Sequence, residues 1–134
     1  MRIKPRIRGE DTTLVDESQT AAAIGSGTVA SFATPSLVTL MESAAISAIT
    51  PYLDEGESSV GTEISIRHMA ATPLGFRVRA EAEVTAVEGK RISFAIVAFD
   101  DLEKIAEGTH ERYVIEFDRF MERVRQKAAK SPNG

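Results

Sequence analysis

The longest stretch with almost no charge predicts a single buried helix. Residues 18–53 contain one charged side chain, Glu42, although 27% of the chain is charged. Thr34 followed by Pro35 predicts a helix start, with the threonine as N-cap and the proline at the first helical position. The helix is expected to end near Thr50, because the proline after it disfavours a helical backbone. Apolar residues three or four positions apart predict its buried stripe, which consists of Leu37, Leu40, Met41, Ala44, Ala45, Ala48 and Tyr52.

Downstream of this helix, alternating apolar and polar residues predict four consecutive strands. The clearest alternation runs from Phe76 to Val87, and a hairpin loop at 88–90 follows it. The other three segments are Gly61–Met69, Arg91–Phe99 and Glu103–Ile115. An antiparallel meander of this kind has one face to cover, so we expect the sheet to wrap around the uncharged helix. The pattern therefore predicts an α+β domain with the layout of the hot-dog fold.

The ends of the chain and the segment before the helix are less regular. Residues 1–10 predict a loose N-terminal arm, and Asp11–Asp16 predicts a first strand. Residues 20–28, TAAAIGSGT, are small and uncharged and predict a flexible connection that is either a lid or a plain loop. Residues 131–134 are expected to form a disordered tail. A short amphipathic helix before it is predicted by Phe117, Phe120, Met121 and Val124.

Composition narrows the function classes. The 134 residues, 43% of them hydrophobic, predict one globular domain with a single core. The chain has no cysteine, which excludes a disulfide framework, a thiolate nucleophile and a thiolate metal site. No secretory signal or membrane-spanning stretch is evident, so we expect a cytoplasmic protein. A net charge of −4 gives no general attraction to nucleic acid or membranes. The basic segment 119–130 is either a solvated helix face or a contact for a polyanion such as a nucleotide diphosphate.

Glu42 is the first candidate for chemistry. On a helical wheel of about 100° per residue it lies about 100° from the centre of the buried stripe. Its neighbours on that flank, Val38, Ile46 and Ile49, are apolar. A carboxylate in such surroundings needs a partner or a water-filled cleft, because an isolated buried charge is very costly. The pattern favours a carboxylate that lines a pocket over one that reaches solvent from the helix flank.

His68 and Thr34 are the next candidates. His68 shares a strand face with Ile64 and Ile66, so its side chain is expected to point toward the helix. A lone inward histidine is more often a core residue, but a Glu–His pair can transfer protons or orient water. Thr34 is either a plain N-cap or a hydroxyl that holds a substrate, a water or an imidazole. The free N–H groups and the positive dipole end of the same helix N-terminus suit a thioester carbonyl that becomes an oxyanion. Thr34 lies about 12 Å along the helix from Glu42, so they either hold different parts of one site or a second protomer completes it.

Two further residues are candidates for contacts to substrate. Gly61 precedes the strand that carries His68 and allows a ligand to approach the backbone closely. Arg112 lies on the last strand and is expected to pair with Glu42, with a substrate group, or with another surface charge. The residues that share its strand face are Gly108, His110 and Val114.

Together, these motifs resemble those of the fluoroacetyl-CoA thioesterase type of hot-dog protein. The resemblance covers about residues 29–124 and rests on FATPSLVTLMESA, ITPYLDEGESSVGTEISIRHMAATPLG and EGTHERYVI. It implies hydrolysis of a short-chain acyl-CoA thioester to acid and CoA by a homodimer, with no metal ion or organic cofactor. It also implies that Thr34, Glu42 and His68 are catalytic, with Glu42 as nucleophile or general base, and that Gly61 and Arg112 bind the ligand.

One segment departs from the pattern of this family. In the fluoroacetyl-CoA enzyme, aromatic residues of a lid before the catalytic threonine close over the acyl group. The corresponding residues here, about Gly25–Thr28, read GSGT and contain no ring. We therefore expect an acyl-CoA thioesterase with a different or broader substrate range. Two other functions fit the same fold, a non-catalytic acyl-CoA-binding or sensing module and an enoyl-CoA hydratase.

Overall fold

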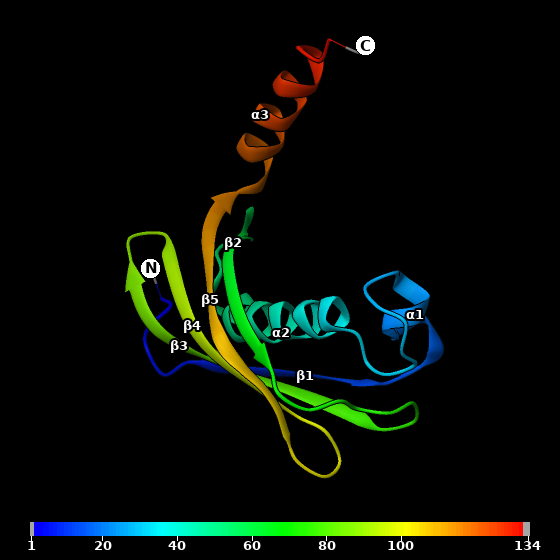
Figure 1. Ribbon diagram of the computed structural model, residues 1–134. Helices are drawn as coiled ribbons and strands as arrows, with labels where there is room; N and C mark the ends of the chain where they lie inside the picture. The colour runs from blue at the N-terminus through cyan, green and yellow to red at the C-terminus, as the bar shows by residue number, and fades with distance from the viewer. Residues whose placement is uncertain (1, 133–134) are drawn as a thin grey trace.

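The structure, a computed structural model, describes residues 2–132 and contains five strands and three α-helices (Figure 1). The strands are β1 (Arg8–Leu14), β2 (Glu57–His68), β3 (Arg77–Glu88), β4 (Arg91–Phe99) and β5 (Lys104–Glu116). The helices are α1 (Ala21–Ile24), α2 (Thr34–Ile49) and α3 (Phe117–Ala129), and 3₁₀ turns span Glu17–Gln19 and Thr50–Tyr52. All predicted strands and both predicted helices are present, with ends that differ by up to four residues.

The strands form one antiparallel sheet that curls around α2, so the predicted α+β hot-dog layout is confirmed (Figure 1). The order in the sheet is β1-β3-β4-β5-β2. The expected meander of four consecutive strands is wrong for β2, which pairs with β5 and not with β3. The connection 69–76 instead binds the segment before α2, where the Phe32 N–H donates to the Thr72 carbonyl over 2.9 Å. As a result, β2 lies at one edge of the sheet.

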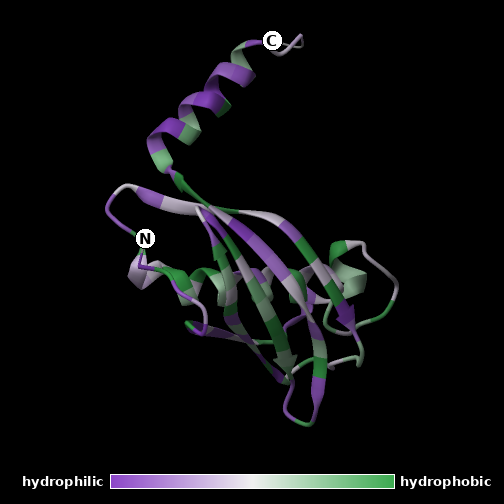
Figure 2. Ribbon diagram, turned by 90° about the vertical axis from the view of Figure 1, so that its left-hand side faces the viewer, coloured by the Kyte–Doolittle hydropathy of each residue, from purple (hydrophilic) through white to green (hydrophobic). Residues whose placement is uncertain are grey.

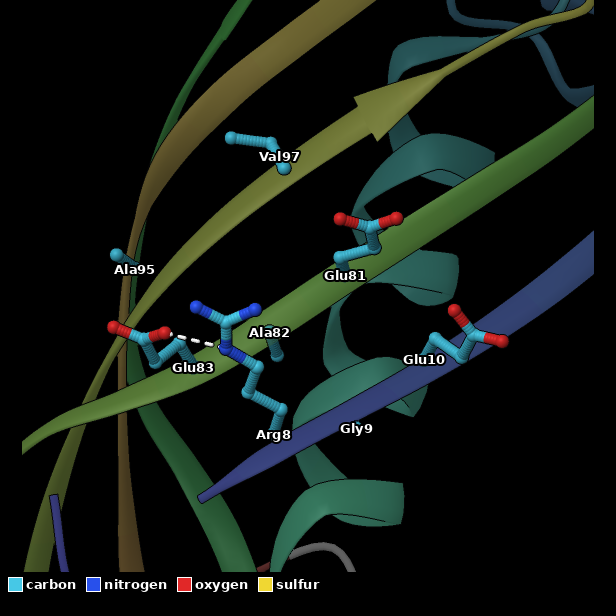
Figure 3. A pocket seen from close by; sticks show the side chains of 8 residues that line it. All are labelled: Arg8, Gly9, Glu10, Glu81, Ala82, Glu83, Ala95 and Val97. Carbon is cyan, nitrogen blue, oxygen red and sulfur yellow. Dashed lines mark hydrogen bonds and ion pairs between the residues drawn. The ribbon is translucent and has the colours of Figure 1, made fainter. Parts of the chain in front are cut away.

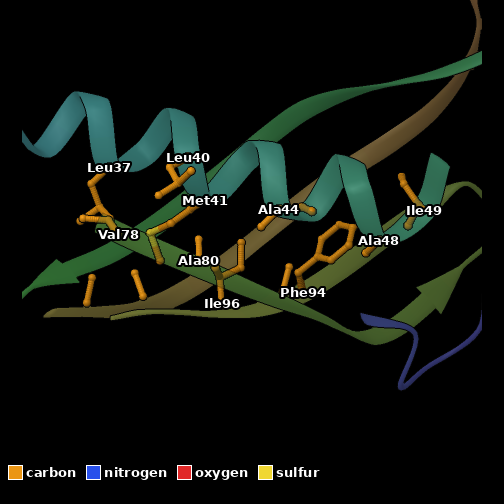
Figure 4. Packing of buried hydrophobic residues seen from close by; sticks show 14 of the residues in the cluster. Leu37, Leu40, Met41, Ala44, Ala48, Ile49, Val78, Ala80, Phe94 and Ile96 are labelled. Atoms are coloured by element: carbon orange, nitrogen blue, oxygen red, sulfur yellow. The ribbon is translucent and has the colours of Figure 1, made fainter. Parts of the chain in front are cut away.

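Helix α2 packs on the concave face of the sheet and supplies much of the core (Figure 4). Its partners on the sheet include Val78, Phe94 and Ile96, which are almost fully buried. Removal of these side chains from water is the main force that holds the helix against the sheet. The predicted stripe is confirmed except at its end, where Ile49 is buried and Tyr52 is only half-buried. The buried residues of α2 are Leu37, Leu40, Met41, Ala44, Ala45, Ala48 and Ile49.

The N-terminal residues are part of the fold, so the prediction of a loose arm over 1–10 is wrong. Strand β1 begins at Arg8, and Ile3 is 2% exposed within the core. The reason is Gly9, where β1 crosses α2 so closely that a Cβ atom would lie 2.2 Å from the backbone nitrogen of Ala48. Only glycine allows this approach. The positions of β1 that face α2 are Gly9, Asp11 and Thr13, and Asp11 accepts a hydrogen bond from Ser43 of the helix. Because these inward positions carry no apolar side chain, no hydrophobic alternation marks the start of the strand in the sequence.

The segment before α2 contains a helical turn and hydrogen bonds that its composition did not predict. Thr20 accepts a hydrogen bond from the backbone of Ala23 and so caps the single turn of α1. Gly25 ends that turn in the left-handed conformation, with φ of 78°. The backbone N–H of Ala21 donates to the carbonyl of Ser31 over 3.0 Å, which closes the segment into a compact loop. This loop lies beside the start of α2 (Figure 1).

Helix α3 projects away from the sheet (Figures 1 and 2). The predicted amphipathic helix is confirmed, but none of its residues is buried, and Phe117 and Val124 are 52% and 43% exposed. Four positively charged residues of this segment are spaced three or four positions apart. They are Arg119, Arg123, Lys127 and Lys130. Within residues 2–132, no helix has the length and apolar character that crossing a membrane requires. Residues 133–134 of the predicted tail lie outside the described residues.

Candidate active site

The start of α2 brings Thr34 and His68 together. Ala33 is the N-cap of α2 and no side chain caps the helix, so Thr34 is already inside its first turn. The Thr34 hydroxyl oxygen lies 2.8 Å from Nδ1 of His68, the last residue of β2. The predicted capping role of Thr34 is therefore wrong, because its hydroxyl is used by the imidazole. We call this pair the Thr34 cluster.

The second nitrogen of the His68 ring, Nε2, is buried and has no hydrogen-bonding partner at normal geometry in the described part of the chain. Buried polar atoms almost always have a partner, so an unsatisfied nitrogen indicates a group that binds there in the working protein. Burial lowers the pKa of His68 below its ordinary value, which favours the neutral ring near pH 7.

Further along α2, Glu42 forms an ion pair with Arg112 of β5. Nη1 of Arg112 lies 3.2 Å from Oε2 of Glu42. Arg112 is 5% exposed, and its Nε and Nη2 donate to the hydroxyl and the carbonyl of Ser59 over 2.8 and 3.1 Å. A guanidinium bound at all three nitrogens has a fixed orientation. The Glu42 side chain remains 37% exposed, and no hydrogen bond within residues 2–132 reaches its Oε1. One carboxylate oxygen is thus anchored and the other is open.

His110 completes this second group of residues, which we call the Glu42 cluster. Nε2 of His110 lies 3.3 Å from Nη1 of Arg112 and 4.0 Å from Oε2 of Glu42. Its ring stacks on Phe94 with 5.8 Å between the ring centroids. Burial lowers the pKa of His110, and the positive charge of Arg112 acts in the same direction.

The two clusters are separate within one chain. The sequence suggested a Glu42–His68 pair, but the imidazole beside Glu42 is that of His110, whereas His68 contacts Thr34. Both clusters nevertheless touch β2. His68 ends this strand, and Gly61 of the same strand faces Glu42. The two clusters therefore lie at different positions along one edge strand.

A hollow of about 320 Å³ opens beside the Thr34 cluster. Its walls come from the loop that contains α1, from the start of α2 and from residues 68–71, and most of them are small side chains. The lining residues include Ala21, Gly27, Val29, Ala33, Met69 and Ala70. No ring from residues 25–28 narrows this hollow, as the sequence GSGT requires.

A larger hollow, of about 540 Å³, lies on the outer face of the sheet (Figure 3). Glu10 and Glu81 line it beside the Arg8–Glu83 ion pair of 2.6 Å, and its floor is formed by Ala95 and Val97. It contains no residue of either cluster and faces away from α2. Within residues 2–132 no group of three or more imidazole and carboxylate side chains is placed to hold a metal ion.

Comparison with known proteins identifies the family. Residues 15–118 match the family of fluoroacetyl-CoA-specific thioesterases. The chain belongs to this family. The fluoroacetyl-CoA thioesterase of Streptantibioticus cattleyicolor is 49% identical over 96 residues, which cover 72% of this chain and 69% of that protein.

Solved structures of thioesterases have the same fold. A structure of fluoroacetyl-CoA thioesterase superimposes with a TM-score of 0.88 at 38% identity, over 97% of this chain and 98% of that chain. A thioesterase superfamily member from Thermus thermophilus has a TM-score of 0.90 at 28% identity, over 97% of each chain. The chain is therefore a hot-dog thioesterase, as the resemblance implied.

In this thioesterase, sequence reasoning did not identify every residue of the two clusters. The sequence placed His110 on the strand face of Arg112 but gave it no role. Ser59 was not singled out, although it lies two residues before Gly61 and therefore on the same face of β2. This alternation was the available signal. Glu42 was one of three partners considered for Arg112, and the structure shows this ion pair.

Gly61 is required by the position of the Glu42 carboxylate. A Cβ atom at Gly61 would come 2.6 Å from Oε2 of Glu42 and 3.3 Å from Nη1 of Arg112. The clash can be relieved by rotation of the Glu42 side chain, so Gly61→Ala should fold with little loss of stability. The displaced carboxylate should lower kcat by about 10- to 100-fold. Steady-state hydrolysis and urea unfolding measure the two effects separately.

The double variant Gly61→Ala, Glu42→Gln provides the matching control. Both substitutions act on one carboxylate, so the double variant should be no less active than Glu42→Gln alone. A Gly61→Ala variant with the kcat of the unchanged chain would contradict this assignment.

Proposed function

We propose that the chain hydrolyses a short-chain acyl-CoA thioester to the free acid and CoA as a homodimer. The observation that carries this proposal is the Glu42 carboxylate, anchored to Arg112 through Oε2 with Oε1 open. Such a carboxylate can attack the thioester carbonyl or remove a proton from an attacking water. Family membership supports thioester hydrolysis as the reaction.

Both routes give the same products. In the first, Oε1 of Glu42 bonds to the carbonyl carbon, the carbon–sulfur bond breaks, and the CoA thiolate takes up a proton. Water then cleaves the mixed anhydride and restores the carboxylate. In the second, Glu42 takes a proton from water, and the water oxygen bonds to the carbonyl carbon. The same carbon–sulfur bond then breaks, and the CoA thiolate takes the proton from Glu42, which restores the carboxylate.

The Thr34 cluster would stabilise the carbonyl oxygen during either route. As the carbonyl carbon becomes tetrahedral its oxygen gains negative charge, and donors aimed at that position lower the barrier. The first turn of α2 offers backbone N–H groups and the positive end of the helix dipole. The unpartnered Nε2 of His68 lies beside them, with its ring held by the Thr34 hydroxyl.

Strand β2 supports the homodimer. It is an edge strand of 12 residues, and a long open edge normally pairs with another strand. The segment 63–67, EISIR, is complementary to itself in antiparallel pairing. With Ser65 on the twofold axis, Glu63 lies opposite Arg67 of the partner subunit, and Ile64 lies opposite Ile66 of the partner subunit. Each contact occurs twice by symmetry.

The same register would bring the two half-sites together. With Ser65 on the axis, His68 lies opposite Thr62 of the partner subunit, next to the Gly61 that faces Glu42 there. The Thr34 cluster of one protomer would then meet the Glu42 cluster of its partner. This arrangement provides His68 Nε2 with a polar cleft and explains why one chain does not join Glu42 to His68.

The hollow beside Thr34 is the proposed site of the acyl group. Most of its lining residues are small, with Phe32 and Met69 as the large apolar exceptions, and its volume leaves room for more than an acetyl group. Residues 25–28 have no aromatic side chain to close over it. The CoA portion would extend from the cleft between the protomers. The cysteine-free chain with its net charge of −4 is proposed to act in the cytoplasm, without nucleic acid or membrane partners.

Thiol release from a panel of acyl-CoA esters tests this function. We expect hydrolysis of acetyl-, propionyl-, butyryl- and fluoroacetyl-CoA, with kcat/KM for acetyl- and fluoroacetyl-CoA within about tenfold of one another. Each added methylene that becomes buried should change kcat/KM by about fourfold. The chain has no cysteine, so a thiol reagent reports CoA alone.

Two further measurements would identify the alternative functions. Thermal stabilisation by acyl-CoA esters that stay intact for hours would indicate a binding or sensing module. Loss of enoyl absorbance from an enoyl-CoA without thiol release would indicate a hydratase. Either result, together with no thiol release from any ester, would overturn the proposal.

A further inference from the structure

His110 is a buried ionisable side chain that the proposed reaction does not use. Among the side chains that are buried within residues 2–132, only His110 and Arg112 can carry a charge. Arg112 has a role, since it anchors Glu42. His110 is 3% exposed and lies behind that ion pair, too deep in the protein to meet the acyl group directly.

The two hydrogen bonds of His110 define its tautomer. Nδ1 lies 2.7 Å from the backbone carbonyl oxygen of Glu63, and a carbonyl only accepts, so Nδ1 carries the proton. Nε2 lies 3.3 Å from Nη1 of Arg112, and a guanidinium only donates, so Nε2 presents its lone pair. Both contacts require the same neutral form of the ring. Burial, which lowers the pKa of His110, acts in the same direction.

This lone pair affects how Arg112 holds Glu42. Nη1 has two N–H groups, and its two acceptors are Oε2 of Glu42 at 3.2 Å and Nε2 of His110 at 3.3 Å. Ser59 binds the other two nitrogens of the guanidinium. With His110 as acceptor, the second N–H of Nη1 is fixed and the first points at Glu42.

We propose that His110, as the neutral tautomer protonated on Nδ1, is a positioning residue that orients Arg112 and through it the Glu42 carboxylate. The proposal rests on the proposed function, because it assigns a role within the same site. His110 contacts no substrate. It sets the direction in which Glu42 presents its open oxygen to the thioester.

Protonation of His110 should break its hydrogen bond with Arg112 and so change the orientation of Arg112 and Glu42. The charged groups that face the ring are Arg112 on its own strand, Glu42 on α2, and Glu111, which adds a weaker attraction for a proton. A proton on Nε2 would remove the acceptor for Arg112 and place two cations 3.3 Å apart. It would also offer Glu42 a second cation at 4.0 Å, and the carboxylate would turn toward it.

Three substitutions separate the two hydrogen bonds of the ring. Glutamine places an acceptor near the position of Nε2, so His110→Gln should keep kcat within about threefold of the unchanged chain. Asparagine keeps only a donor for the Glu63 carbonyl, and phenylalanine keeps only the stacking on Phe94. His110→Asn and His110→Phe should therefore lower kcat by about 10- to 100-fold, with a smaller change in KM.

The pH profile of kcat gives a readout that a purely structural role would not change. The pKa values of His68 and His110 are both lowered, so the acid limb should lie below pH 6.5, the ordinary value for histidine. In the unchanged chain a proton on His110 removes the acceptor for Arg112 and displaces Glu42, so kcat should fall as this ring gains its proton. His110→Gln lacks this ring, so its acid limb should lose that component and lie at lower pH than the limb of the unchanged chain.

Nitrogen NMR of the unchanged chain tests the tautomer without any substitution. The chain has two histidines, so a His68→Gln variant assigns both ring signals. We expect the Nδ1-protonated form of His110 at pH 7.5. An Nε2-protonated or charged ring would overturn the proposal even if every His110 variant failed to fold.

The kinetic outcomes also separate this proposal from the proposed function. If His110→Asn and His110→Phe keep normal kcat while Glu42→Gln is inactive, the positioning role is wrong and the thioesterase site stands. If Glu42→Gln remains fully active, the proposed site itself fails. Equal losses for all three His110 variants would also overturn the positioning role, because the acceptor would then not matter.

Discussion

Replacing Glu42 with glutamine is expected to lower kcat for acyl-CoA hydrolysis by about 10²- to 10⁴-fold while the protein stays folded. Glutamine has nearly the shape of glutamate, but its amide neither attacks a thioester nor takes a proton from water. Both routes that the carboxylate can follow are therefore lost together. The KM should change much less, because Arg112 and the walls of the cleft remain. Steady-state thiol release at saturating acyl-CoA measures the effect.

A stability measurement must accompany this variant, because the substitution leaves Arg112 without its counter-charge. Removing one partner of a fully buried ion pair costs about 3–5 kcal/mol. The cost should be smaller here, because the Glu42 side chain is 37% exposed and water reaches the pair. Urea unfolding of Glu42→Gln checks this. Glu55→Gln, in an exposed turn, is the matched control and should have normal kcat. An undiminished kcat for Glu42→Gln would remove the basis of the proposed mechanism.

Local patterns predicted the elements of this fold because each pattern has one structural meaning. The apolar stripe of the long helix has to be covered on one side, and alternating strands supply a sheet with one apolar face. The lone charge of Glu42 in that helix required a partner, and a buried arginine provides it. The strand face of Arg112 could be read from alternation alone. These inferences depend on residues that are close in the sequence.

Inferences about distant pairings were less successful, because hydrophobic alternation does not specify which strands are neighbours. Strand β2 also alternates, but this alternation does not show that it lies beside β5 and not beside β3. The role of Thr34 had the same weakness. A threonine before a proline is typical of an N-cap, and an imidazole was one of three other partners expected for its hydroxyl. Only the position of His68 in space decides between these roles. Gly9 likewise acquires meaning only from the helix that it touches.

A heterodimer of two inactive variants is expected to recover activity, the second large effect. In the proposed homodimer each site takes the Glu42 cluster from one protomer and the Thr34 cluster from the other. A heterodimer of Glu42→Gln with His68→Gln then contains one doubly substituted site and one intact site. It should have about half the kcat of the unchanged dimer, whereas each variant homodimer should be almost inactive. Two affinity tags allow the heterodimer to be purified, and thiol release measures its activity.

The matched control pairs two variants of the same cluster. A heterodimer of Glu42→Gln with Arg112→Gln has a damaged Glu42 cluster at both sites, so it should stay as inactive as its parents. Recovery in the first heterodimer and not in the second would support a site shared between subunits, because subunit exchange and refolding affect both mixtures equally. If neither heterodimer recovers activity, each site lies within one protomer. Glu42 and His68 would then have to be brought together by a movement of α2 against β2, because in this structure they belong to separate clusters.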